Sequence, residues 1–181
     1  MSREHSEARR RFKSMCRKRE QDEKVLLDRT KMLLKTYRGT GWSVMERPAM
    51  EEEIPDSDYQ IRPEIFRAID YLESFDPEKD KDDFEDRLEP LFETSWIQEI
   101  VSMTMNKVRE FPCYGSIYYS ILNDCFFSAF KYTEREMVEL MKMERSVYYD
   151  RKKEAIMTFA VALWNTAVPK IRSFEKESGV A

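Results

Sequence analysis

The chain has 181 residues, of which 41% are apolar and 36% charged, with four glycines, three cysteines and a formal net charge of −4. So few glycines leave little material for tight turns, which argues against an all-β fold, while stretches rich in Glu, Lys, Arg, Leu and Met favour helices. No apolar run approaches the length of a membrane span and no secretory leader precedes the scattered cysteines, so we expect a cytoplasmic protein with reduced thiols and no membrane partner.

The charge is unevenly distributed along the chain. Residues 1–38 hold 13 Lys and Arg against 6 Asp and Glu, a net of +7, whereas residues 39–110 hold 8 against 20, a net of −12. Residues 111–181 are almost balanced, with 10 against 9. Because binding to a phosphate surface depends on the local field, the mildly acidic total does not exclude a nucleic-acid partner.

Residues 1–43 are expected to form a basic arm followed by an amphipathic helix. Residues 2–24 are nearly all polar and offer almost no apolar stripe, so we expect a frayed or disordered arm, with a nucleic-acid-binding arm as the alternative. Apolar residues then recur at helical spacing and predict a helix over residues 21–38, which Gly39 and Gly41 are expected to end.

The next two segments are expected to differ in structure, the first being a linker and the second helical. Residues 44–60 contain two prolines and an acidic excess, which are typical of a linker. Residues 61–112 are expected to be a helical middle region, in which Pro63 suits the first turn of a helix. The acidic run at 75–86 interrupts this pattern, and one further helix, or two with a break near residues 94–95, is expected to follow.

Residues 113–168 are expected to form a further helical unit, and residues 169–181 a tail. The region opens with a turn, after which Ser116 is the candidate N-cap of a strongly apolar helix. Thr133 is a second candidate N-cap, with Glu136 at the capping-box position of a helix of two to three turns.

The end of this region follows the pattern of a helix-turn-helix, in which a short helix packs on a longer one across a turn of three or four residues. Met143 is the apolar residue of the turn and is expected to fill the joint. In the longer helix, over about residues 145–164, Tyr148, Ala155 and Phe159 lie on one side and are expected to dock inward. Any helical hairpin has two amphipathic helices and a turn, so the pattern alone leaves a purely structural hairpin open.

The other sides of the longer helix carry candidate DNA contacts. The expected DNA-binding residues are Arg145, Ser146, Tyr149, Arg151, Lys152, Lys153 and Thr133. The first three lie near the N-terminus of the longer helix, where side chains reach base edges in a major groove. The basic run that follows suits phosphates better.

A resemblance to a known family supports this interpretation. Residues 140–164 resemble the C-terminal end of the ArpU-type phage late-gene regulators, and residues 114–141 are similar to the first two helices of region 4 of bacterial sigma factors. The matching positions are Leu140, Arg145, Ser146, Tyr148, Tyr149, Arg151, Lys152, Lys153, Glu154 and Ala155. Two residues depart from the pattern: Glu144 replaces the usual Ser or Thr cap, and Asp150 interrupts the basic run.

The resemblance implies a transcriptional regulator of phage or prophage type that binds duplex DNA in a sequence-specific manner. We expect an all-α helical bundle in which residues 113–168 form a C-terminal three-helix helix-turn-helix unit that binds DNA. The N-terminal helices are expected to serve homodimerisation or contact with RNA polymerase. The acidic middle and the two departures keep open a helical protein–protein interaction protein with a vestigial helix-turn-helix, and a small-terminase-like DNA-packaging adaptor is a third hypothesis.

The sequence does not predict an enzyme, a metal site or a cofactor. No Cys or His pair has zinc-ligand spacing, and His5 is the only histidine, remote from Cys113 and Cys125. The two glycines near Trp42 are not flanked by a strand, so they do not make a phosphate-binding loop.

Overall fold

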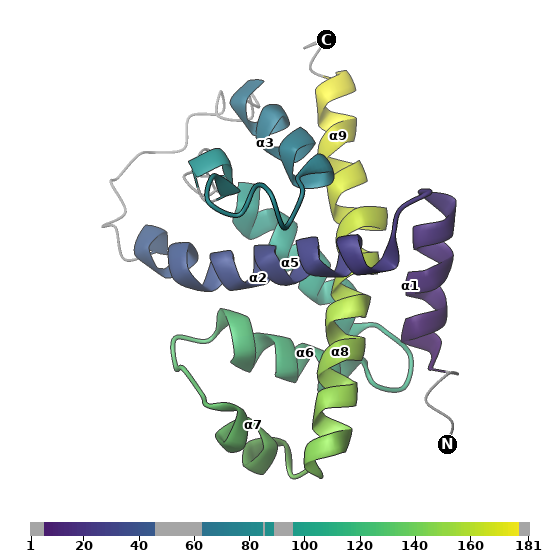
Figure 1. The fold of residues 1–181 in the computed structure, drawn as a ribbon, viewed down its shortest axis with the longest axis vertical. Helices are drawn as coiled ribbons and strands as arrows, with labels where there is room; N and C mark the ends of the chain where they lie inside the picture. The colour runs from purple at the N-terminus through teal and green to yellow at the C-terminus, as the bar shows by residue number, and fades with distance from the viewer. Residues whose placement is uncertain (1–5, 46–62, 85, 89–95, 178–181) are drawn as a thin grey trace.

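The computed structural model describes residues 6–45, 63–84, 86–88 and 96–177, and every regular element in these ranges is helical. The all-α prediction is therefore confirmed. Figure 1 shows α8 (Arg145–Ala162) as a long helix near the centre, against which several other helices pack. Within the described ranges no helix is both long and apolar enough to cross a membrane.

Helix α1 (Glu7–Lys18) corrects the expectation of a disordered basic arm. Its N-cap is Ser6, whose hydroxyl accepts a hydrogen bond from the backbone N–H of Arg9 at 3.3 Å. Its buried residues are Ala8, Phe12, Met15 and Cys16. Their spacing of three and four residues puts them on one face, and α1 buries this face alongside α8 (Figure 1). Four apolar side chains on one face are enough to dock a helix whose other residues are polar.

Helix α2 (Glu23–Met45) extends beyond the predicted end, because it continues through Gly39 and Gly41. A glycine inside a helix costs only about 1 kcal/mol relative to alanine. The earlier turns of α2 are anchored in the core by Leu26, Leu33 and Leu34, so packing outweighs this cost. The break predicted at the two glycines is therefore wrong.

The middle region matches its prediction where it is described. Helix α3 (Pro63–Ser74) begins at the expected proline, and the acidic run after it is non-helical up to residue 83 and helical again at Phe84. Most of the expected acidic linker and the expected break near residues 94–95 lie outside the described residues. Helix α5 (Trp96–Arg109) follows and packs against α6 and α8.

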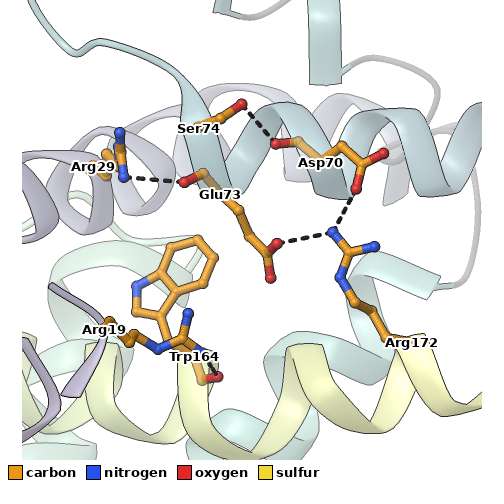
Figure 2. A network of polar contacts seen from close by, with 7 residues as sticks. All are labelled: Arg19, Arg29, Asp70, Glu73, Ser74, Trp164 and Arg172. Carbon is orange, nitrogen blue, oxygen red and sulfur yellow. Dashed lines mark hydrogen bonds and ion pairs between the residues drawn. The ribbon is translucent and has the colours of Figure 1, made fainter. Parts of the chain in front are cut away.

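Polar contacts join α2, α3 and α9 (Val168–Glu177), as Figure 2 shows. The Arg172 guanidinium of α9 pairs with the carboxylates of Asp70 at 2.5 Å and Glu73 at 2.8 Å. Arg29 of α2 donates to the backbone carbonyl of Glu73 at 3.0 Å and to that of Phe75 at 2.7 Å. Residues 169–177, expected to be part of a tail, therefore form a helix tied to the acidic middle region.

Helix α6 (Gly115–Leu122) starts without the predicted cap, because Gly115 is its first residue and Ser116 lies inside the helix. Gly115 approaches the end of α5 so closely that an added Cβ would lie 2.4 Å from the carbonyl oxygen of Arg109. This packing against the preceding helix, and not a hydroxyl cap, sets where α6 begins. A π-helical turn (Asn123–Phe127) continues α6.

The remaining helices follow α6 in order. Helix α7 (Glu134–Met141) lies beside the N-terminal end of α8, at the end of the molecule opposite to α3 and α9 (Figure 1). A second π-helical turn (Leu163–Ala167) links α8 to α9. In each π-helical turn a backbone carbonyl accepts from an arginine near the N-terminus: Arg38 of α2 donates to Cys125, and Arg19, the C-cap residue of α1, donates to Trp164 at 2.5 Å. Helices α1 and α2 are thus integral parts of the same core.

Candidate nucleic-acid interface

The capping box predicted at Thr133 is present. The Thr133 hydroxyl accepts from the backbone N–H of Glu136 at 3.3 Å, and the Glu136 carboxylate accepts from the backbone N–H of Thr133 at 2.7 Å. The bond from the Thr133 backbone N–H is the largest cause that holds the pKa of Glu136 below its ordinary value, and the Thr133 hydroxyl, which donates to the same carboxylate at 2.9 Å, lowers it further. Thr133, one of the expected DNA contacts, is exposed and lies on the surface as the N-cap of α7.

The connection between α7 and α8 is short and is held by a backbone hydrogen bond. Lys142 adopts a left-handed conformation with φ of 51°, and the next residue, Met143, donates its backbone N–H to the carbonyl of Val138 at 3.4 Å. Met143 packs against a small buried cluster of Ile121, Met137 and Tyr148. The predicted filling of the joint by Met143 is therefore confirmed.

The inward face of α8 is also as predicted, because Tyr148, Ala155 and Phe159 are all buried. The Tyr148 hydroxyl lies 3.4 Å from the sulfur of Cys125, and burial raises the pKa of Tyr148 well above its ordinary value. The core side of α8 thus joins it to α6 and to the π-helical turn that follows α6.

A buried acid on α8 was not foreseen from the sequence. Glu154 is 4% exposed, and its carboxylate accepts from the Tyr118 hydroxyl at 2.8 Å and from the Arg151 guanidinium at 2.7 Å. The guanidinium of Arg151 also lies over the ring of Tyr114 at 3.8 Å. Arg151, expected to contact phosphate, is therefore engaged within the molecule. The three-residue spacing of Arg151 and Glu154 was the only sequence signal for this network.

Two other expected contacts turn toward α7. The Tyr149 hydroxyl donates to the Glu134 carboxylate at 2.5 Å, and the Lys152 ammonium lies 3.7 Å from the same carboxylate. The hydrogen bond from Tyr149 is the largest cause that holds the pKa of Glu134 below its ordinary value. Glu134 therefore competes with any outside anion for both side chains.

The remaining expected contacts are exposed on the N-terminal half of α8. Arg145, Ser146 and Lys153 all face solvent, and the Arg145 guanidinium lies 5.8 Å from the centre of the Tyr149 ring. Spacing of three and four residues puts Ser146 and Lys153 on the same side of the helix as Asp150. The structure thus brings this subset of the expected residues onto one outward face of α8.

Helix α1 contributes to this region in a way that the sequence pattern did not suggest. The Arg9 guanidinium of α1 lies 3.9 Å from the carboxylate of Asp150, the acid that interrupts the basic run. Arg10 and Arg11 follow in the same turn of α1. A cationic side chain from a distant segment therefore offsets the negative charge of Asp150. The arginines at residues 9–11 are visible in the sequence, but no local pattern indicates that Arg9 lies beside Asp150.

No protein-family model, curated protein or solved structure matches the chain. The similarity to ArpU-type regulators therefore stays a prediction. Among the described residues no group of three or more His, Cys, Asp or Glu side chains is placed to hold a metal ion.

Proposed function

We propose that the chain is a sequence-specific duplex-DNA-binding regulator, in which α7 and α8 act as a helix-turn-helix and the N-terminal half of α8 enters the major groove. The observation that carries the proposal is the outward face formed by Arg145, Ser146 and Lys153, at the end of a helix anchored by its buried face. A major groove about 12 Å wide admits an α-helix, and the first turns of such a helix meet the base edges.

The roles of the side chains follow from their chemistry. Arg145 is the candidate for bidentate contact with guanine, since its guanidinium presents two parallel donors. Lys153, two turns along the helix, is the candidate for a phosphate contact. Lys152 and Tyr149 are held by Glu134, so their contribution requires the exchange of that carboxylate for a DNA acceptor.

The assignment as a phage-type transcription regulator rests on the resemblance over residues 114–164. Contact with RNA polymerase and homodimerisation remain predictions. The hydrogen bonds from Arg19 and Arg38 to the two π-helical turns join the N-terminal helices to the core that carries α8, which suits a protein that presents one helix to DNA.

A mobility-shift series tests the proposal, with the DNA upstream of the protein's own gene and a random duplex of equal length. We expect binding that weakens steeply between low and moderate salt, because phosphate contacts release counterions. Arg145→Ala should lower specific affinity by about 1–3 kcal/mol, and Lys153→Ala should weaken binding to both duplexes alike.

Lys170→Ala is the matched control, because Lys170 is an exposed lysine on α9, a helix that lies toward the end of the molecule opposite to α7 (Figure 1). This variant should bind as the wild type does. The proposal fails if the wild-type protein shows no binding at low salt, or if Lys170→Ala weakens binding as much as Lys153→Ala does.

A second candidate function is protein–protein interaction, and exposed apolar side chains near α7 favour it. Phe130 is 71% exposed and Leu140 is 49% exposed, and the Phe130 ring lies 5.5 Å from that of Tyr132. This alternative predicts a stable protein complex that Phe130→Ser weakens and that charge removal at residues 151–153 does not affect. Light scattering and co-purification of the two variants distinguish it from DNA binding.

A further inference from the structure

A cavity of about 590 Å³ lies between the first turns of α1, the turn at residues 111–114 and the N-terminal half of α8. Binding sites for small molecules have volumes of roughly 300–1,000 Å³. The proposed DNA contacts Arg145, Ser146 and Lys153 do not line this cavity, so the proposed function leaves it without a role.

One wall of the cavity is apolar and partly aromatic. It is made by Phe111, Pro112 and Tyr114 from the turn before α6, and by Val147 from α8. Tyr114 is 38% exposed and Val147 is 39% exposed, so both belong to the small set of large apolar residues that the described structure leaves open to solvent. A ligand with a flat apolar body would lie against Val147 and against the part of Tyr114 that Arg151 leaves uncovered, and would remove this apolar surface from water.

Among the described residues that line the cavity, the charged groups carry a net positive charge. They are Arg9, Arg10, Arg11, Arg151, Glu7, Asp150 and Glu154. Four guanidinium groups from this part of the chain thus stand beside three carboxylates. An apolar ligand without charge would leave this excess unmatched.

The internal pairing shows which guanidinium has capacity for a ligand. Glu7 is bound by Arg10 and by Arg11, the latter at 2.8 Å, and the hydrogen bond from Arg11 holds the pKa of Glu7 below its ordinary value. Glu154 is bound by Arg151 and by a tyrosine hydroxyl. Arg9 differs, because its ion pair with the Asp150 carboxylate is long at 3.9 Å and, within the described residues, its buried Nε has no hydrogen-bond partner.

From this combination we infer that the cavity is a binding site for a small organic anion with a flat apolar body. The anionic head pairs with Arg9, and the apolar body lies against Tyr114 and Val147. Such a ligand contacts α1 and α8 at once and so stabilises their packing. Binding at this site does not depend on whether the protein binds DNA.

Isothermal titration calorimetry on the full chain tests the inference with three probes of the same shape: 2-naphthoate, 2-naphthyl phosphate and the neutral 2-naphthamide. At least one anion should bind with a Kd of about 1 mM or below, and the amide about tenfold more weakly. Arg9→Gln should remove this preference for the anion, and Arg9→Lys should retain part of it. Lys13→Gln, on an exposed residue of the same helix that does not line the cavity, should bind as the wild type does.

Val147→Trp provides an independent check, since a larger ring at this partly exposed position fills the cavity without entering the core. It should abolish binding of all three probes while circular dichroism shows a folded protein. The inference is overturned if the folded wild type binds neither anion at about 1 mM. It is also overturned if the amide binds as tightly as the anions do, or if Arg9→Gln and Val147→Trp leave the affinity unchanged.

Discussion

The buried carboxylate of Glu154 leads to the sharpest prediction about stability. Glu154→Ala removes the acceptor of two hydrogen bonds, from the Tyr118 hydroxyl at 2.8 Å and from the Arg151 guanidinium at 2.7 Å. Tyr118 is 1% exposed, so its hydroxyl loses the partner against which it is buried. The Arg151 side chain is 23% exposed and can be partly solvated again.

The magnitude follows from these two environments. An unsatisfied buried hydroxyl costs about 1–3 kcal/mol, and a hydrogen bond to a charged group contributes about 1.5–3 kcal/mol. Because water can replace part of the interaction that Arg151 loses, we expect Glu154→Ala to lower the free energy of unfolding by about 3 kcal/mol in total. For a chain of this length such a loss lowers Tm by roughly 6–12 °C.

Urea denaturation followed by circular dichroism and tryptophan fluorescence measures the effect. Glu154→Gln keeps an acceptor for Tyr118 and should lose only about 1–2 kcal/mol, and Tyr118→Phe should lose about 1 kcal/mol. Glu139→Ala is the matched control, because Glu139 is paired with an arginine on the exposed side of α7. It should change stability by less than about 0.5 kcal/mol. A loss below about 1 kcal/mol in Glu154→Ala would refute the reasoning, since the network would then contribute no more than one ordinary hydrogen bond.

Three further predictions concern the backbone and the thiols. Gly115→Ala should destabilise the fold by about 2 kcal/mol or more in the same urea assay, because a Cβ would meet the Arg109 carbonyl oxygen. Ser116→Ala, at the exposed next position, should lower the free energy of unfolding by less than about 0.5 kcal/mol. Lys142→Gly should raise the free energy of unfolding by up to about 1 kcal/mol, since glycine adopts the left-handed conformation without strain; a lower stability would contradict the observed φ of 51°. Burial raises the pKa of Cys16 to about 11. At pH 8 iodoacetamide should therefore label the exposed Cys113 and leave Cys16 unmodified, which peptide mass mapping measures. Rapid labelling of Cys16 would mean that α1 does not pack against the core.

The sequence alone determined those features that depend on neighbours within one or two helical turns. The capping box at Thr133 needs a hydroxyl and a carboxylate three residues apart, and α3 begins at Pro63 because proline suits the first turn. The inward side of α8 was also readable, since Tyr148, Ala155 and Phe159 follow a helical period.

The tertiary structure alone decided which weakly patterned segments are buried and which charges are paired. Helix α1 has only four buried residues among many polar ones, and α8 provides the surface that makes their burial favourable. Glu154 is buried because Tyr118, 36 residues away, supplies a hydroxyl, and Asp150 is offset by Arg9 from the opposite end of the chain. Local patterns set helix type and caps because those energies arise between near neighbours, whereas burial and ion pairing depend on groups that only the folded chain brings together.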